Sequence, residues 1–263
     1  MSDRRTVMVS LQNIELVFNR GTIDENRLFE NFCLSVDDGE FVSIVGSNGS
    51  GKTTLLNLIC GTMKPDSGRV VIGGDVTSAP EYRRAKRIGR VLQDPKMGTC
   101  ADLTILENLS LADNKNKRYG LSRAVNKQRE DYYRSLLEMC DMGLENRMGT
   151  LAGSLSGGQR QALALTIATM SDIDLLILDE HTAALDPKSS ETLMRITQRV
   201  VSEKKYTTLM VTHNLRFAAE YGTRLLMMHG GQAVMDMSGE EKQRIKVDDI
   251  LDKFNEISIE CGN

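Results

Sequence analysis

The sequence has no tryptophan, only four prolines and no excess of positive charge. Its 33 lysines and arginines are balanced by 36 aspartates and glutamates, which give a net charge of -3. This balance argues against a nucleic-acid binder that works through bulk positive charge. No apolar run approaches the ~18–20 residues that span a bilayer. No apolar stretch follows the two arginines near the N-terminus either, so the sequence predicts neither a membrane span nor a secretory signal.

The sequence also lacks the cysteine patterns of a disulfide framework or a zinc site. It contains five cysteines, with no C-x-x-C pair and no partnering histidine. An odd, scattered set is typical of reduced thiols in a cytosolic protein. These residues are Cys33, Cys60, Cys100, Cys140 and Cys261.

What is present is an alternation of strand and helix patterns over 263 residues. This alternation predicts an α/β fold with a largely parallel sheet. Between about residues 94 and 155 the strand signals fade and helical spacing appears, which indicates a helical insertion. Strands are expected at 7–18, 41–45, 69–72, 88–92, 175–178 and 207–211. Helices are expected at 53–60, 103–111, 125–140, after 156 through 170, and at 187–201. The charged stretch 238–254 is expected to form a solvated helix that packs on the edge of the domain.

A glycine-rich loop follows the strand predicted at 41–45 and matches G-x-x-x-x-G-K-[ST] between a strand and a helix. Glycines let consecutive backbone N–H groups face phosphate oxygens, and the next helix presents its positive N-terminus to the same anion. The alternative is a glycine-rich turn before an ordinary helix. The predicted ATP-binding residues of this loop are Gly46, Ser47, Asn48, Gly49, Ser50, Gly51, Lys52, Thr53 and Thr54.

Two acids follow the apolar strand predicted at 175–178. Ligand chemistry in parallel sheets sits at the carboxyl ends of strands. We therefore expect Asp179 to hold Mg²⁺, directly or through a water, and Glu180 to orient and deprotonate an attacking water. The alternative is a pair of acids that merely end a strand.

The run Leu155-Ser156-Gly157-Gly158-Gln159 resembles the LSGGQ signature of ATP-binding cassette (ABC) ATPases. The resemblance implies a second anion site, which closes on ATP held by a partner copy in a head-to-tail homodimer. It implies a P-loop NTPase (RecA-like) core with a mixed sheet, an N-terminal antiparallel β part and an inserted helical subdomain. The chain is then a single ABC ATPase domain, 1–263, with a catalytic lobe at 5–93 and 161–263 and a helical subdomain with the signature at 94–160.

The resemblance extends to other positions, in the order that the family has them. Gln93 is similar to the Q-loop glutamine, which senses Mg²⁺ and water, and Asp186 to the D-loop aspartate. His213 resembles the switch histidine at the γ-phosphate, with an ordinary core or surface histidine as the alternative. Phe18 stands where an aromatic ring stacks on adenine, although it could equally be a core residue of its strand. The implied catalytic set is Glu180, His213 and Gln93, and the implied metal ligands are Thr53, Gln93 and Asp179.

The sequence departs from the family pattern in two places. His181 replaces the usual proline after the glutamate, and Ala162 and Ile167 replace arginines of the helix that follows the signature. We interpret His181 as a structural variation that adds a polar contact, with a catalytic role left open.

The function implied by the resemblance is ATP binding and hydrolysis, with Mg²⁺, by a subunit that powers solute transport through separate transmembrane permease subunits. A bacterial importer branch that takes up small organic solutes, including aromatic amino acids, is the expected subgroup. A solute-binding protein is then a further partner, and the chain would lie at the cytoplasmic face of the membrane. The alternative is a non-transport ABC ATPase in a soluble assembly complex. A small-molecule kinase would leave residues 155–159 unexplained.

Overall fold

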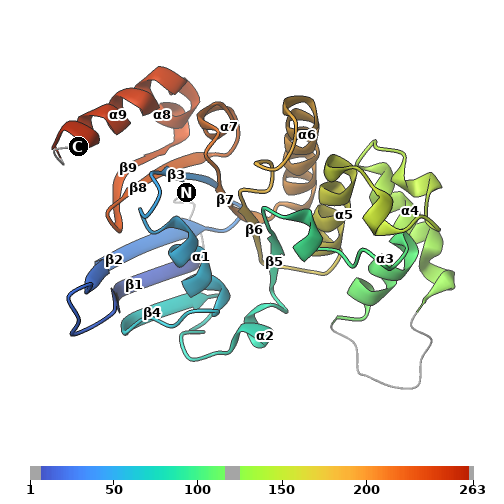
Figure 1. Cartoon of the computed structure of the whole chain (residues 1–263), viewed down its shortest axis with the longest axis horizontal. Helices are drawn as coiled ribbons and strands as arrows, with labels where there is room; N and C mark the ends of the chain where they lie inside the picture. Colours follow the sequence, from blue (N-terminus) through green and yellow to red (C-terminus); the bar gives the residue numbers. More distant parts are fainter. Residues whose placement is uncertain (1–6, 116–124, 261–263) are drawn as a thin grey trace, which may run out of the picture. The chain divides into compact units, whose positions relative to one another are not determined.

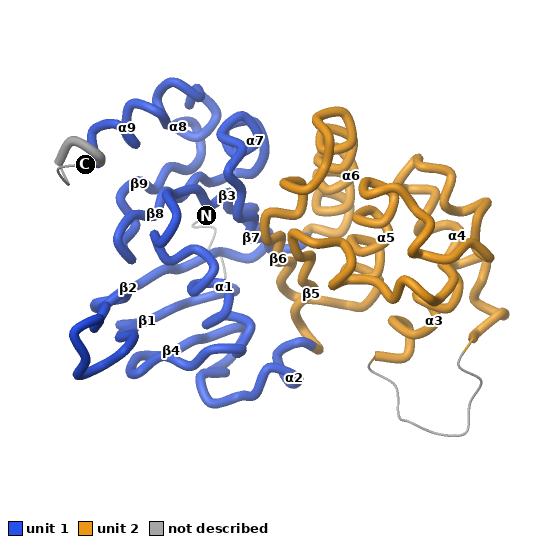
Figure 2. Tube along the Cα trace, viewed as in Figure 1, with its two compact units in different colours: residues 1–85, 206–263 blue, residues 86–205 orange. Residues whose placement is uncertain are grey.

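The computed structural model describes residues 7–115 and 125–260, which fall into two compact units (Figure 1 and Figure 2). Unit 1 comprises residues 1–85 and 206–263, and unit 2 comprises residues 86–205. These bounds differ from those predicted for the catalytic lobe (5–93 and 161–263) and for the helical subdomain (94–160). The division into lobe and subdomain remains a prediction. Within the described ranges, no helix combines the length and the apolar composition that a bilayer span requires.

One sheet of unit 1 is antiparallel, as the predicted N-terminal β part requires. It has the order β2 (Asn26–Asp37), β1 (Val7–Phe18) and β4 (Ser67–Ile72). The sequence analysis did not find β2. Its buried positions shift between the two faces near Asn31, which has a φ of 52°, so no clean alternation marks the strand.

The other strands of unit 1 form a mixed array in the order β7 (Thr207–Val211), β3 (Phe41–Gly46), β8 (Arg224–His229) and β9 (Gln232–Ser238). The first three are parallel, and β9 runs antiparallel to β8. Every residue of β3 is buried, which explains its continuous apolar pattern. The helices of this unit are α1 (Lys52–Cys60), α2 (Glu81–Arg84), α7 (Leu215–Glu220), α8 (Gly239–Arg244) and α9 (Val247–Glu260).

A buried arginine, Arg84, binds the backbone at the C-terminal end of α1. The guanidinium of Arg84 donates to the carbonyls of Leu58 and Ile59 in the last turn of the helix. It also donates to the carbonyls of Thr77 and Ala79 in the loop before α2. Burial lowers the pKa of Arg84, and these four carbonyl acceptors replace the lost hydration.

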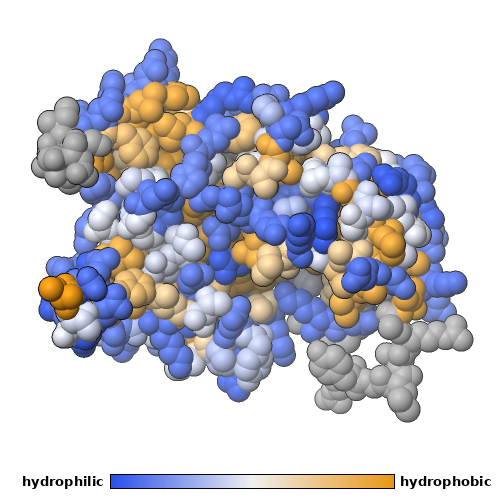
Figure 3. Space-filling view, in the orientation of Figure 1, coloured by the Kyte–Doolittle hydropathy of each residue, from blue (hydrophilic) through white to orange (hydrophobic). Residues whose placement is uncertain are grey.

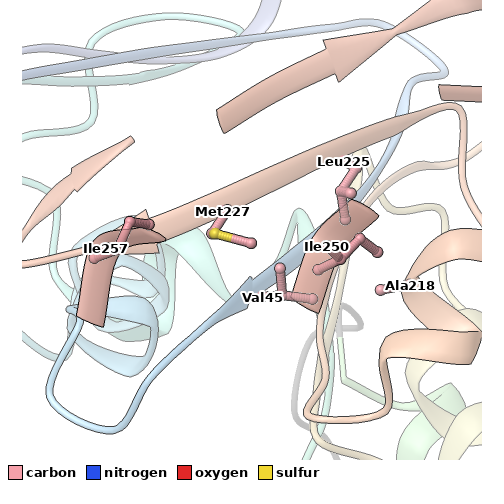
Figure 4. Close-up of a cluster of buried hydrophobic side chains, with 6 residues drawn as sticks. All are labelled: Val45, Ala218, Leu225, Met227, Ile250 and Ile257. Carbon is pink, nitrogen blue, oxygen red and sulfur yellow. The ribbon is translucent and has the colours of Figure 1, made fainter. Parts of the chain in front are cut away.

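The C-terminal segment packs on unit 1, as predicted, but it is neither a single helix nor solvated along its whole length. It forms two helices, and Ile250 and Ile257 of α9 pack with Met227 of β8 and Val45 of β3 (Figure 4). Val45 directly precedes Gly46, so α9 supports the strand that ends in the glycine-rich loop.

Unit 2 contains a parallel strand pair and the predicted helices. β5 (Ile88–Val91) pairs with β6 (Leu175–Asp179). The helical stretch begins at α3 (Ile105–Asp113), where Thr104 and Glu107 form a capping box. The remaining elements are α4 (Glu130–Glu138), α5 (Gly157–Thr169), α6 (Pro187–Lys204) and the short 3-10 helices η1 (Pro95–Met97), η2 (Lys127–Arg129), η3 (Leu144–Asn146) and η4 (Ala152–Ser154).

Candidate ATP-binding and hydrolysis site

The glycine-rich loop joins β3 to α1 in unit 1 and has the geometry of an anion cradle. Gly46, Gly49 and Gly51 have φ values of 155°, 79° and 102°. A Cβ at Gly46 would lie 2.2 Å from the carbonyl oxygen of Met228, so only glycine fits there. No side chain caps the N-terminus of α1. Residues 47–49 are exposed, so the first N–H groups of the helix can meet an anion.

The Lys52 side chain lies back over this loop. Its Nζ donates to the carbonyl oxygens of Gly46 at 2.8 Å and Ser47 at 2.9 Å, and it lies 3.4 Å from Ser50 Oγ. The residue is buried. These acceptors are neutral, and phosphate oxygens form stronger, charge-assisted hydrogen bonds with an ammonium group. Of the two threonines that follow, Thr53 is exposed and Thr54 is half-buried.

His213 lies at the same edge of the sheet as the loop. Ile44 of β3 pairs in parallel with Val211 of β7, and Gly46 and His213 each follow that pair by two residues. His213 is exposed. The next residue, Asn214, is the N-cap of α7, and its Oδ1 accepts a hydrogen bond from the N–H of Phe217. Phe18 lies at the end of β1 and is half-buried, and its adenine-stacking role stays a prediction.

In unit 2, the two acids follow the apolar strand as expected. Asp179 ends β6, and its Oδ2 accepts from Nη2 of Arg90 at 2.8 Å. Glu180 has a φ of 50°, a left-handed conformation that costs a non-glycine residue free energy. Its carbonyl accepts from the N–H of Ala183 at 2.9 Å, so a tight turn follows the acid.

His181 is packed inside unit 2. Its Nε2 lies 3.3 Å from Oγ1 of Thr197 on α6, and the residue is 2% exposed. Burial lowers the pKa of His181 to about 4, which keeps the ring neutral near pH 7. The ring makes a polar contact inside the unit, as we expected of this substitution.

Gln93 is exposed just beyond β5, and a residue that the sequence analysis did not single out holds the preceding backbone. Nε2 of the fully buried Gln161 donates to the carbonyl of Leu92 at 2.8 Å. Gln161 and Arg90 could have been noticed as polar residues in otherwise apolar stretches, but neither belongs to a short motif.

The signature residues form the start of α5. Ser156 caps this helix and exchanges hydrogen bonds with Gln159 in a capping box. Added Cβ atoms at Gly157 and Gly158 would lie 3.2 Å from side-chain atoms of Leu185 and Ser189. The two glycines therefore let α5 approach the segment around Asp186. The buried Leu155 precedes the cap.

Asp186 caps α6 through its side chain, which accepts from the N–H of Ser189 at 3.1 Å. Hydrogen bonds from the Ser189 hydroxyl and amide lower the pKa of Asp186. Unit 2 thus holds Gln93, Asp179, Glu180, the signature and Asp186, while unit 1 holds the cradle and His213. Over the described part of the chain, no group of three or more His, Cys, Asp or Glu side chains is arranged to hold a metal.

Comparison with known proteins identifies the family. Residues 29–183 match the family described as ABC transporter. A tyrosine transport ATP-binding protein of Clostridioides difficile (strain R20291) is 44% identical over 248 residues, which cover 94% of this chain and 98% of the relative. The thiamine import ATP-binding protein ThiQ of Shigella flexneri serotype 5b (strain 8401) is 34% identical over 211 residues, which cover 80% of this chain and 86% of ThiQ.

The fold agrees with a solved structure of an ATP-binding cassette. The dimeric cassette MJ0796, in a post-hydrolysis state bound to ADP and Pi, matches with a TM-score of 0.74 and 29% identity. The match covers 88% of this chain and 98% of that one. The predicted fold class and ATPase activity are confirmed. With the cradle, the strand-end acids and the signature helix in place, the chain belongs to the ABC transporter family, as an ATP-binding and ATP-hydrolysing subunit.

Proposed function

We propose that this chain powers the import of a small organic solute, with an aromatic amino acid as the first candidate, through separate permease subunits. The observation that carries this proposal is the 44% identity, over nearly the whole length of both chains, to a tyrosine transport ATP-binding protein. Two copies would bind two ATP molecules between the cradle of one and the signature of the other. The complex would lie at the cytoplasmic face of the membrane and would receive solute from a solute-binding protein.

In the cradle, Lys52 would exchange its carbonyl acceptors for the β- and γ-phosphate oxygens of ATP. The N–H groups of the loop and of the first turn of α1 would hold the remaining phosphate oxygens. Phe18 would stack on adenine through its exposed part. These contacts position the γ-phosphate, which is the main task of a phosphoryl-transfer site.

The expected metal ligands suit Mg²⁺, which prefers hard oxygen donors. Thr53 offers a hydroxyl, Gln93 an amide oxygen and Asp179 a carboxylate. The carboxylate of Asp179 already interacts with one cation, the guanidinium of Arg90. Bound Mg²⁺ would neutralise charge on the phosphate oxygens.

Glu180 would take the proton of the attacking water, and the tight turn after it would restrict the position of the carboxylate. His213 would donate a hydrogen bond to the γ-phosphate. The partner copy would add the hydroxyl of its own Ser156 and the N–H groups at the start of its α5, which form a preorganised anion site. Asp186 would act at the same dimer interface.

The surface of unit 2 offers contacts for a permease subunit. Its exposed large apolar side chains include Met97, Leu111 and Leu151. Figure 3 shows hydrophobic side chains at the surface of the unit that contains α3 and α4. A cytoplasmic helix of the membrane subunit would cover such side chains.

The hydrolysis mechanism is tested with Glu180→Gln, with the exposed Glu203→Gln on α6 as the matched control. The Glu180 variant should bind ATP, accumulate as a dimer in size-exclusion chromatography with ATP and Mg²⁺, and lose hydrolysis by ~100-fold or more. The control should hydrolyse ATP at the wild-type rate. Wild-type turnover in the Glu180 variant would show that another group is the base.

The transport role is tested by purifying the tagged chain from membranes with its permease and reconstituting the complex in proteoliposomes. Labelled tyrosine should accumulate only with ATP, and the complex with Glu180→Gln should not accumulate it. Uptake of labelled thiamine in place of tyrosine would overturn the solute assignment. Recovery of the chain only in a soluble complex would favour the assembly-complex alternative.

A further inference from the structure

Two ion pairs join β5 to β6 in unit 2, one at each end of the strand pair. Arg87 and Asp174 pair just before the two strands begin. Arg90 and Asp179 pair at the carboxyl ends, with Nη2 and Oδ2 2.8 Å apart. The side chains of the first pair are 46% and 32% exposed, whereas those of the second are 22% and 13% exposed. The two pairs share one chemistry but differ in position and burial.

Strand register creates the contact between Arg90 and Asp179. Arg90 is aligned with Ile177 in the parallel pair. Side chains alternate along a strand, so Asp179, two residues after Ile177, lies on the same face as Arg90. The other three residues of β5 are buried, and Arg90 alone is partly exposed. An arginine at this position is therefore aimed along the neighbouring strand at its terminal carboxylate.

The guanidinium of Arg90 places a positive charge directly against this partly buried carboxylate. The function proposed above assigns the same carboxylate to Mg²⁺. A metal held by Asp179, directly or through a water, would add a second positive charge beside a carboxylate whose Oδ2 already accepts a charge-assisted hydrogen bond from the guanidinium. Two cations beside one carboxylate repel each other, so each weakens the binding of the other.

We propose that Arg90 opposes the binding of Mg²⁺ at Asp179: its guanidinium holds the carboxylate when no metal is bound, and the two cations would compete for that one carboxylate. This inference rests on the assignment of Asp179 to the metal. Arg90 is a positioning residue that holds the carboxylate in place between turnovers. It also lowers the affinity for Mg²⁺, so that release of the metal with the products is faster than from an unopposed carboxylate.

The experiment measures the affinity for Mn²⁺, a probe with the same preference for oxygen ligands as Mg²⁺. The full-length protein is saturated with a non-hydrolysable ATP analogue, and the loss of the free Mn²⁺ signal is followed by electron paramagnetic resonance. Arg90→Met removes the charge and nearly keeps the length of the side chain. It should tighten Mn²⁺ binding by about tenfold, which is typical of the coupling between two sites. Arg90→Lys keeps the charge and should bind Mn²⁺ with nearly wild-type affinity.

Arg87→Met is the matched control, because it breaks the same kind of pair on the same two strands at their opposite end. It should leave the Mn²⁺ affinity unchanged. Unchanged or weaker Mn²⁺ binding by Arg90→Met, with the control unaffected, overturns the role of Arg90. If that variant does not fold, Arg90→Gln keeps a hydrogen-bond donor without the charge and should likewise bind Mn²⁺ more tightly than wild type. Asp179→Asn tests the metal assignment separately: wild-type Mn²⁺ affinity in this variant would refute that assignment, whatever Arg90 does.

Discussion

The burial of His181, the residue after Glu180, allows a quantitative prediction about stability and pH. His181 is 2% exposed and is hydrogen-bonded to Thr197. Burial lowers its pKa from 6.5 to about 4. Between these two pH values the unfolded chain binds a proton that the folded chain does not bind. The free energy of unfolding is therefore undiminished above pH 6.5 and falls as the pH decreases toward 4.

The size of this loss follows from the shift. Each pKa unit corresponds to ~1.4 kcal/mol, so the whole interval contributes about 3 kcal/mol and a change from pH 7.5 to pH 5 about 2 kcal/mol. His181→Gln keeps a hydrogen-bonding group but cannot titrate. Urea unfolding at both pH values should show wild type losing about 2 kcal/mol more than this variant.

A second measurement isolates the imidazole. The chain has only three histidines, so NMR titration with single His→Gln variants assigns each ring. His181 should titrate near pH 4. An NMR pKa above 6 for this ring, or identical losses of stability in wild type and His181→Gln, would refute a buried neutral histidine. His229→Gln serves as the control and should keep the pH dependence of wild type.

Three further substitutions test the residues that form the glycine-rich loop or stabilise the strand and helix on either side of it. Ile250→Ala should lower the free energy of unfolding by about 3 kcal/mol, whereas Leu251→Ala on the same helix, at a position 43% exposed, should cost less than ~1 kcal/mol; equal losses in urea unfolding would contradict the packing of α9. Arg84→Met leaves buried carbonyls without their donor and should cost about 3 kcal/mol, and a thermal transition at the wild-type temperature would count against that role. Gly46→Ala places a Cβ 2.2 Å from the Met228 carbonyl and should weaken binding of a fluorescent ATP analogue by ~100-fold; an unchanged dissociation constant would show that the loop adapts.

The cradle and the signature could be predicted because each is a short local pattern whose function depends on adjacent residues. The positive φ values of Gly46, Gly49 and Gly51 and the capping box at Ser156 are consequences of those few residues. Most of the main strands and helices could be located for the same reason, since a buried strand such as β3 is a continuous apolar run and an amphipathic helix such as α6 shows a helical period.

The contacts that could not be predicted from the sequence join residues that are far apart in the chain. The contact of Arg90 with Asp179 requires the register of two strands whose paired residues are separated by a long helical stretch. The hydrogen bond from Gln161 to the Leu92 carbonyl has the same origin. The C-terminal segment was expected to pack at the edge of the domain, but its many charges conceal a buried stripe, and only the packed structure identifies Ile250 and Ile257 as core residues.

The pairing of β3 has a consequence for the synthesis of the chain. The N–H of Phe41 donates to Thr223, a residue 182 positions later, and both neighbours of β3 come from the last quarter of the sequence. At ~5–20 residues per second, a ribosome needs roughly 10–40 s to make the intervening polypeptide. Until then the nascent chain carries the phosphate-binding sequence without the sheet that shapes it. We therefore expect the loop to reach the geometry described above only after β7 and β8 have been synthesised.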